Sequence, residues 1–544
     1  MKKYYKLILL ALASPMLTFA QAPVEDLHNA PQVRAGVSPL FMNDVVVAPS
    51  ALRETGTSIS VAYNGWVYVS TGVETMDSDS SGCIVRMSRD NGYTWTPCVS
   101  FLYAGVDYLA PEIEVAGTDT TNLALFITSA WYDSSSGTSD VWVDKYYARN
   151  GSFISEVYNE SFYYPVRDID IASDYRYPAQ FASPYSVGLL YSHYGTTDSI
   201  IFVSSGDGGT TWGNRQGVAG TIACYGNVSL AFGVSSNWYF GRYFAAWEER
   251  SSFSGTTIGH IKTAHCTTTF NGTWSSVYCV DSSDAALSGI VRRPRIACQY
   301  NSTVNNDSNG VTVLIQFERA YAGDTADCDI IGLYSKSQPA GNSWNRYDIE
   351  NNTAQTLQPD IAYDPAYNNF LLTYYNRTGG TMCYKVHDYN MIVPSTWAVI
   401  TNNYCDQPNT LKDPFPRIAI NPALTQAAFS WTRQTGTPSR GQAMYDAEYM
   451  TTATEEPVAV TGILVYPNPA NQQFNIELAL QEEMPVRIGL YDLNGRLVSS
   501  VAEQTFGAGN QLLRVPTADL PNGIYMLTVF TGNNVNSQRI VVAH

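Results

Sequence analysis

The chain has 544 residues, a formal net charge of −17, and only 15% charged residues against 13% aromatic ones. This length exceeds that of one ordinary domain, so we expect at least two. The acidic balance offers no basic patch and argues against binding to nucleic acid or anionic membranes. Plentiful Tyr, Trp, Thr, Ser and Val favour an all-β fold of short strands joined by polar turns.

Residues 1–20 have the pattern of a secretory signal peptide. Lys2 and Lys3 precede an apolar run over residues 7–12, and the small residues Thr18 and Ala20 provide a cleavage site. The run is too short to cross a membrane, and no later segment is long and apolar enough to do so. We therefore expect cleavage before Gln21 and export of a soluble protein, which we expect to be a monomer.

Two eight-residue stretches, 88–95 and 205–212, fit S-x-D-x-G-x-T-W, and each lies between two β-type runs. The glycines supply the positive φ of a tight turn, and the aspartates accept hydrogen bonds from the turn's own backbone. This pattern is the Asp-box, and the chain resembles the sialidase-like Asp-box β-propellers. By position in such a blade these residues are structural: Ser88, Asp90, Gly92, Trp95, Ser205, Asp207, Gly209 and Trp212.

A second repeat, P-x-[IF]-A or a near variant, begins at Pro178, Pro294, Pro359 and Pro416, with a looser copy at Pro111. Each copy opens a short strand that a second apolar strand follows. Residues 58–63 and 228–232 fit the scheme without the proline. The seven units lie roughly 50 to 65 residues apart, the period of propeller blades. We expect seven blades over residues 21–450, with six and an insertion as the alternative.

The first unit shows its four strands directly, at residues 58–63, 66–70, 83–88 and 93–100. The seventh unit is incomplete at its C-terminal end. The run at residues 41–47 is expected to supply the missing outer strand. Such closure joins both ends of the ring and removes exposed sheet edges.

The nine cysteines belong to an oxidising compartment if the chain is exported. Three pairs at short separations would each tie two adjacent strands of a hairpin: Cys83 with Cys98, Cys266 with Cys279, and Cys383 with Cys405. Cys224, Cys298 and Cys328 leave room for one further pair and one thiol. The cysteines and histidines have no metal-site spacing, so we expect no metal.

One stretch, residues 77–82, resembles the start of a calcium loop. Its twelfth position is Ser88 rather than a bidentate glutamate. A polar surface turn is therefore favoured over a calcium site, and no cofactor is expected.

After a polar linker at residues 451–461, residues 462–544 read as a small immunoglobulin-like β-sandwich. They carry Y-P-N-P-A at 466–470, L-Y-D-L-N-G-R at 490–496 and L-P-N-G-I-Y at 520–525. This segment closely resembles the C-terminal sorting domain of the type IX secretion system of Bacteroidetes. The resemblance implies an interaction with that machinery, carriage across the outer membrane, and often attachment to the cell surface. An unrelated accessory domain is the alternative.

The propeller resemblance implies a functional face opposite the Asp-box turns, the funnel face. There, first strands open with Glu112, Arg295, Asp360 and Arg417. Second strands end in a further charged set: Arg250, Arg319, Arg377, Arg433, Glu248 and Glu318. Converging guanidinium groups and carboxylates suit an anionic or sugar ligand. The alternative is a repeated ring of salt bridges between blades.

Sialidase resemblance implies an arginine triad, an acid/base aspartate and a Tyr–Glu nucleophile pair. The sequence has no R-I-P motif before the first Asp-box and too many tyrosines to single out one, so no catalytic residue is assigned. A general glycosidase needs two suitably spaced carboxylates, for which Glu248, Glu249, Glu318 and Asp360 are candidates. We predict an exported, surface-attached propeller that binds a glycan or protein ligand, with a secreted sialidase-type glycoside hydrolase as the alternative.

Overall fold

The computed structural model describes residues 40–449 and 463–544 apart from short gaps. Every regular element among them is a β-strand, and they contain no helix with the length and apolar character to span a membrane. The chain divides after Glu448 into two compact units. The gaps are residues 48–51, 76–79, 110, 118–122, 134, 175–184, 194–198, 221–223, 235–240, 251–258, 268–269, 282–289, 300–310, 322–323, 339–343, 351–352, 368, 389–401, 404–408, 410, 412, 436–439, 481–483, 493–495, 508 and 532–533.

Several expectations fall outside these residues. They are the signal peptide at 1–20, the linker at 451–461, the first half of the calcium-like stretch at 77–82, the P-x-F-A copy at 178–182, Cys405 and the side chain of Cys224.

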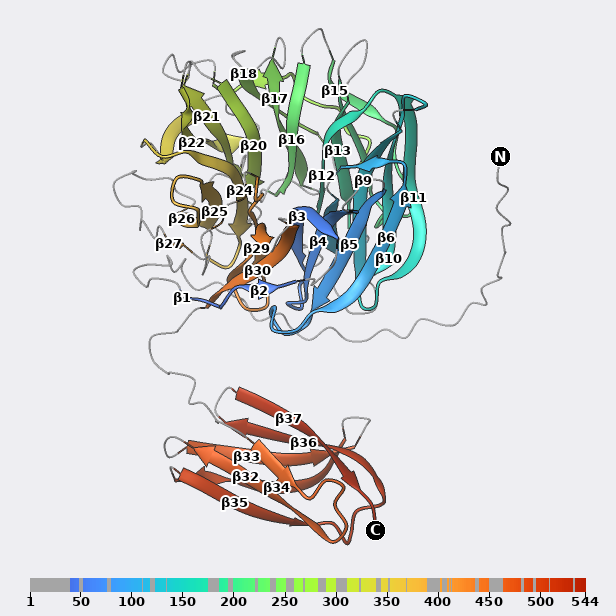
Figure 1. The fold of residues 1–544 in the computed structure, drawn as a ribbon, viewed down its shortest axis with the longest axis vertical. Coiled ribbons are helices and arrows are strands. Elements are labelled where there is room, and N and C mark those ends of the chain that lie inside the picture. The colour runs from blue at the N-terminus through green and yellow to red at the C-terminus, as the bar shows by residue number, and fades with distance from the viewer. Residues whose placement is uncertain are drawn as a thin grey trace, which may run out of the picture. The chain divides into compact units, whose positions relative to one another are not determined.

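The described part of the first unit forms seven antiparallel sheets (Figure 1). The first four blades are β3–β6 (Arg53–Val61, Val67–Glu74, Ser80–Ser88, Thr96–Ala104), β7–β11 (Asp107–Tyr108, Glu112–Ala116, Ala124–Asp133, Thr138–Tyr147, Ser152–Tyr163), β12–β15 (Val166–Ser173, Val187–His193, Ser199–Ser205, Gln216–Gly220) and β16–β19 (Cys224–Gly233, Arg242–Arg250, Gly259–His265, Tyr278–Cys279). The other three are β20–β23 (Ile290–Cys298, Val311–Tyr321, Asp324–Gln338, Asn345–Glu350), β24–β27 (Thr356–Asp364, Asn369–Asn376, Thr381–Asp388, Asn402–Asn403) and β28–β30 (Arg417–Asn421, Gln426–Thr435, Arg440–Tyr449), joined by β1 (Leu40–Phe41) and β2 (Val45–Val46).

The innermost strands close a ring. The strands β3, β8, β12, β16, β20, β24 and β28 each contact the next, and β28 contacts β3. This closed order is a seven-bladed β-propeller, which confirms the seven-blade prediction over the six-blade alternative. Second strands are buried on both faces because each blade is covered by two neighbours, as in β4, where seven of eight residues are buried.

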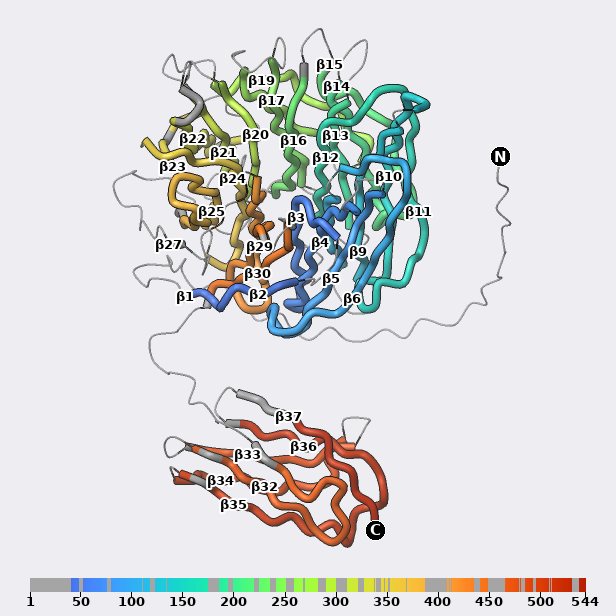
Figure 2. The backbone as a smooth tube through the Cα atoms, in the orientation of Figure 1, coloured from blue at the N-terminus to red at the C-terminus, as the bar shows by residue number. Residues whose placement is uncertain are grey.

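The N-terminal strands complete the seventh blade, as expected for residues 41–47. Both β1 and β2 pair with β30, which in turn pairs with β29 (Figure 2). Asp44, whose side chain is 3% exposed, forms an ion pair of 2.9 Å with Arg433. The ring is therefore closed by residues nearly 390 positions apart in the chain.

The two S-x-D-x-G-x-T-W turns have the same hydrogen-bond network. Ser88 Oγ donates to Asp90 and accepts from the N–H of Gly92, while Asp90 accepts the N–H and hydroxyl of Thr94. The second turn repeats every one of these bonds with Ser205, Asp207, Gly209 and Thr211. The aspartates are thus occupied by their own turns.

The tryptophan of each turn packs against the preceding blade. The Trp95 ring lies 5.1 Å from that of Tyr445 in the seventh blade, and the Trp212 ring lies 5.5 Å from that of Tyr158 in the second. Each turn therefore helps to join two blades.

The third blade corrects one detail of the repeat. Its first strand is β12, which pairs with β13 and ends before residue 178. The P-x-F-A copy at 178–182 therefore does not open this blade. The sequence around β12, R-D-I-D-I-A, fulfils the same role without a proline.

The strand register also corrects the predicted disulfides. Cys83 and Cys98 are both free thiols, because Cys83 lies opposite Phe101, three residues along the strand from Cys98. Cys279 lies opposite Lys262, whereas Cys266 bridges to Trp274, so these two cysteines are not facing partners. Cys383 lies opposite Asn403, and because Cys405 lies outside the described residues its predicted pairing with Cys383 stays a prediction.

The second unit is a small β-sandwich, as predicted. One sheet has the order β31 (Ile463–Tyr466), β32 (Gln473–Leu480) and β35 (Gly509–Pro516). The other has the order β34 (Leu497–Phe506), β33 (Met484–Tyr491), β36 (Gly523–Thr531) and β37 (Asn534–Val542). Alternate apolar residues of both sheets, including Phe474, Ile488 and Leu527, form one buried core.

Candidate functional site

A channel runs through the centre of the propeller and is lined by one side chain from the same position of each first strand. These seven residues, which we call the channel ring, are Ser58, Glu112, Asp170, Ser229, Arg295, Asp360 and Arg417. Four of them are the residues predicted from the first strands. The ring holds three carboxylates and two guanidinium groups.

A backbone bulge directs these side chains inward. The ladder between first and second strands slips just before the ring residue, at Arg292/Arg295 in the fifth blade and Leu357/Asp360 in the sixth. The residue ahead of the proline takes a left-handed conformation, with φ of 50° at Arg293 and 54° at Gln358. Such a bulge re-aims the following side chain, which explains why the P-x-I-A motif repeats.

Two of the predicted second-strand glutamates hold this bulge in the next blade. Glu248 accepts the N–H of Arg293 at 3.4 Å, and Glu318 accepts the N–H of Gln358 at 2.6 Å. These carboxylates therefore serve the backbone and stand one strand outside the channel.

The ring residues also connect neighbouring blades. Asp170 accepts the N–H of Leu230 at 2.7 Å, and Asp360 accepts the N–H of Ile418 at 2.9 Å. Ser58 and Ser229 make the equivalent bond to the first strand of the blade that follows theirs. These four ring side chains thus fix the register between neighbouring innermost strands.

The charged members of the ring form an alternating chain around the channel. Arg417 pairs with Glu112 and lies 4.0 Å from Asp360, while its Nε donates to the carbonyl of Thr57 at 3.1 Å. Arg295 lies 3.7 Å from Asp360 and 4.0 Å from Asp170. The order is carboxylate, arginine, carboxylate, arginine, carboxylate, so both arginines are neutralised by other blades.

Burial sets the electrostatics of these carboxyl groups. It raises the pKa of Asp170 to about 7, with the charge of Glu112 adding to the effect and Arg295 opposing it. Burial also raises the pKa of Glu112, against the attraction of Arg417 and Arg295. Because the ring holds three carboxyl groups and two guanidinium groups, one retained proton brings its net charge to zero.

The channel opens at the funnel face into a cavity of about 340 Å³. Its wall combines charged, amide and aromatic side chains, among them Tyr108, Arg167, Asp168, Asn227, Arg293 and Phe415. Asp168 is held by the N–H of Val228 and the amide of Asn227. The wall is therefore organised in advance of any ligand.

The remaining predicted residues do not reach the channel. Arg250 pairs with Glu248 at 2.5 Å and donates to the carbonyl of Val291, and Glu318 pairs with Arg293 at 2.8 Å. Glu249 pairs with Lys262 at 3.5 Å. Arg319 is buried, Arg377 is exposed, and Arg433 pairs with Asp44. They stand at the ends of second strands, one strand spacing of about 4.8 Å farther out.

Sequence reasoning missed Asp170, Asp168 and Arg293. A signal existed for Asp170, because Asp170-Ile-Ala matches the x-I-A part of the repeat. The absence of the proline, and a better-looking copy at Pro178, concealed it.

A tyrosine–glutamate group exists, but not in the channel. Tyr158 and Tyr191 donate to Glu160 at 2.6 and 2.7 Å, and Arg215 pairs with the same carboxylate. Tyr158 and Glu160 belong to β11, the outermost strand of the second blade. Burial raises the pKa of both tyrosines, which makes them poor nucleophiles. Among the described residues, one group of candidate metal ligands, His260, Cys279 and Asp281, also lies outside the channel.

Comparison with solved structures returns several at low sequence identity. A protein of unknown function from Dyadobacter fermentans is 12% identical, with a TM-score of 0.45 over 76% of this chain and 100% of that one. The α-L-arabinanase of Penicillium chrysogenum is 12% identical, with a TM-score of 0.41 over 65% and 100%. The NanB sialidase of Streptococcus pneumoniae is 8% identical, with a TM-score of 0.39 over 61% and 67%. No curated protein matches the chain.

The C-terminal unit has a clear relative among protein families. Residues 464–543 match the secretion system C-terminal sorting domain. This range contains all seven strands of the second unit except the first residue of β31. The chain is therefore an exported β-propeller cargo of the type IX secretion system, delivered to the cell exterior by its C-terminal sorting domain.

Proposed function

We propose that the propeller is a non-catalytic carbohydrate-binding module that holds a sugar in the cavity at the mouth of its channel. The observation that carries this proposal is the cavity of about 340 Å³ with its mixed polar and aromatic wall. Small-molecule sites occupy roughly 300–1,000 Å³ and place a few polar groups among apolar ones. A protein partner instead needs about 800 Å² of its own surface in contact, which favours a broad face over a cavity.

The ion pairs that the arginines already make support binding without catalysis. An enzyme of the sialidase type needs guanidinium groups that can pair with a substrate carboxylate. Arg417 and Arg295 are instead committed to Glu112, Asp360 and Asp170. Arg293, at the cavity wall, already pairs with Glu318. A neutral sugar, held by hydrogen bonds to preorganised amides and carboxylates and by aromatic contact, suits this wall better than an anionic one.

The test is a glycan array followed by calorimetric titration of the mature protein with the best oligosaccharide. We expect Tyr108→Ala, which removes an aromatic ring from the cavity wall, to weaken binding at least about tenfold, or 1.4 kcal/mol. Tyr93→Ala is the matched control, because Tyr93 is 63% exposed in the Asp-box turn on the opposite face. Equal loss in both variants, or no glycan bound more tightly than about 1 mM, would contradict the proposal.

A second candidate, a glycoside hydrolase, is favoured by one observation. Asp170, with its pKa raised to about 7, shares the channel with Asp360, which two arginines approach. A carboxyl group with a raised pKa beside a second carboxyl group is the pairing that glycoside hydrolysis uses. A panel of fluorogenic glycosides, including a sialoside, separates the two. Turnover that disappears in Asp170→Asn and in Asp360→Asn would establish the hydrolase and overturn the binding module.

A further inference from the structure

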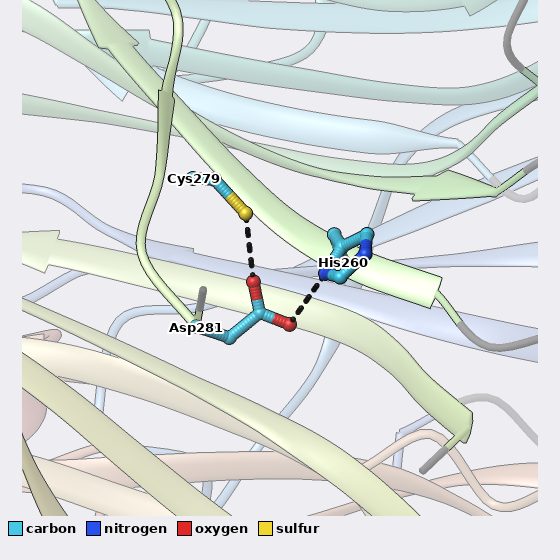
Figure 3. A group of neighbouring side chains, drawn as sticks. All are labelled: His260, Cys279 and Asp281. Carbon is cyan, nitrogen blue, oxygen red and sulfur yellow. Dashed lines mark hydrogen bonds and ion pairs between the residues drawn. The ribbon is translucent and has the colours of Figure 1, made fainter. Parts of the chain in front are cut away.

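Three side chains of different chemistry converge on the outer part of the fourth blade (Figure 3). His260 comes from β18, Cys279 ends β19, and Asp281 follows two residues later. Asp281 Oδ2 lies 3.3 Å from His260 Nδ1, and Asp281 Oδ1 lies 3.1 Å from Cys279 Sγ. All three candidate ligand atoms lie within 4.8 Å of one another.

The strand register brings them together. Cys279 lies opposite Lys262, and the chain then runs along β18 toward its start. The N–H of Val280 donates to the carbonyl of Ile261 at 3.0 Å, which continues the pairing by one residue. Asp281 consequently arrives beside His260. The ligands are 19 and 2 residues apart in sequence, a spacing that no short motif reveals.

We propose that His260, Cys279 and Asp281 bind a zinc ion, with a fourth position open to water. Imidazole nitrogen, thiolate and carboxylate are the donor types that zinc accepts in tetrahedral sites, and three protein ligands with an exchangeable fourth are typical of open sites. Calcium and magnesium take oxygen ligands and have little affinity for a thiolate. The charges agree as well, because one thiolate and one carboxylate balance the two positive charges of the ion.

A zinc tetrahedron sets the spacing that the three ligand atoms must reach. With zinc bonds of about 2.0 Å to nitrogen and oxygen and about 2.3 Å to sulfur, the ligand atoms stand roughly 3.3 to 3.6 Å apart. Asp281 places one carboxylate oxygen 3.3 Å from His260 Nδ1 and its other oxygen 3.1 Å from Cys279 Sγ. One oxygen of Asp281, His260 Nδ1 and Cys279 Sγ lie within 4.8 Å of one another, so rotation of the carboxylate and of the other two side chains would bring the three atoms to the zinc spacing.

Burial distinguishes the inner and outer sides of the site. The Asp281 side chain is 2% exposed, whereas that of His260 is 50% exposed. Asp281 therefore anchors the ion from within the blade, and solvent reaches it from the histidine side. Lys262, which faces Cys279 in the ladder, pairs with Glu249 at 3.5 Å. The Lys262 ammonium group also interacts with the Cys279 sulfur, a contact that a bound zinc ion would replace.

The test uses the mature full-length protein and cobalt as a spectroscopic substitute for zinc. We expect one equivalent of Co²⁺ to give a sulfur-to-cobalt charge-transfer band and the visible bands of a tetrahedral ion, and one equivalent of Zn²⁺ to abolish both. Cys279→Ser removes the charge-transfer band, and His260→Ala weakens zinc binding by about tenfold or more. Asp281→Asn tests the buried ligand, with circular dichroism to establish that the variant is folded.

His265→Ala is the matched control, since His265 lies on the same strand but outside the cluster. It should leave the metal spectra unchanged. Cys266→Ser should also leave them unchanged, because Cys266 bridges to Trp274 instead of facing Cys279. Three outcomes would overturn the proposal: no charge-transfer band at stoichiometric cobalt, a band that survives in Cys279→Ser, or an intact mass two hydrogens short with Cys279 recovered in a disulfide peptide.

Discussion

Arg417 offers the sharpest test of the channel ring. Its guanidinium group meets Glu112 and Asp360 and donates to the carbonyl of Thr57, so it joins the seventh blade to the sixth, first and second. The side chains of Arg417, Glu112 and Asp360 are only 13%, 9% and 13% exposed. Arg417→Met keeps much of the side-chain length and removes the charge.

We expect Arg417→Met to lower the free energy of unfolding by about 3–5 kcal/mol, because it leaves buried carboxylates without their partner. Adding Glu112→Gln removes one of those charges, so the double variant should regain roughly 2 kcal/mol of that loss. Urea unfolding followed by tryptophan fluorescence measures both quantities. Arg377→Met is the control, with a change of at most about 0.5 kcal/mol for an exposed arginine.

Two results would refute this reasoning. A loss below about 1 kcal/mol in Arg417→Met would mean that the buried pair contributes no more than a surface one. Strict additivity of the two substitutions would mean that Arg417 and Glu112 are not energetically coupled.

Three further predictions concern other parts of the molecule. Burial raises the pKa of Asp174 to about 7, so the folded state holds a proton that the unfolded state releases near pH 4, and stability is lost as pH rises through 7. The Asp174→Asn variant keeps the acceptor for the N–H of Ser186. In urea titrations it should remove about 2–3 kcal/mol of the stability loss between pH 5 and 8. Gly92→Ala should lower the free energy of unfolding by roughly 2–4 kcal/mol, because φ is 94° and the new Cβ would lie 2.0 Å from the Tyr445 ring. Gly105→Ala is the control: φ is 76° but the space around it is open, so the loss in the same assay should be about 1 kcal/mol. Deleting residues 463–544 should leave the melting temperature of the propeller unchanged, because the units have separate cores, and should abolish export as measured by cell fractionation.

The blade order was predictable because alternating apolar strands and turn residues are local features of sequence. The same holds for Glu112, Arg295, Asp360 and Arg417, which occupy one position of a repeat and therefore one level of the channel. The arginines at second-strand ends have equally regular spacing, yet they lie one strand farther out. The distance of a side chain from the channel axis depends on which strand of the blade carries it, and the spacing of charged residues along the sequence does not reveal that strand.

The cysteines illustrate a second limit. A short separation along the chain makes two cysteines members of one hairpin, but whether they face each other depends on register. The register sets Cys83 opposite Phe101, so Cys98 stands three residues farther along the partner strand. In contrast, the cluster of His260, Cys279 and Asp281 arises from register alone and has no local pattern to find.

The position of β30 has a mechanical consequence. The chain leaves the propeller from the end of β30 on its way to the sorting domain, so any pull on that domain first reaches this strand. β30 lies between β29 on one side and β1 and β2 on the other, and antiparallel ladders hold both of its edges. Tension is thus divided between two sets of hydrogen bonds that must break together, which should let the propeller resist shear when its C-terminal end is tethered.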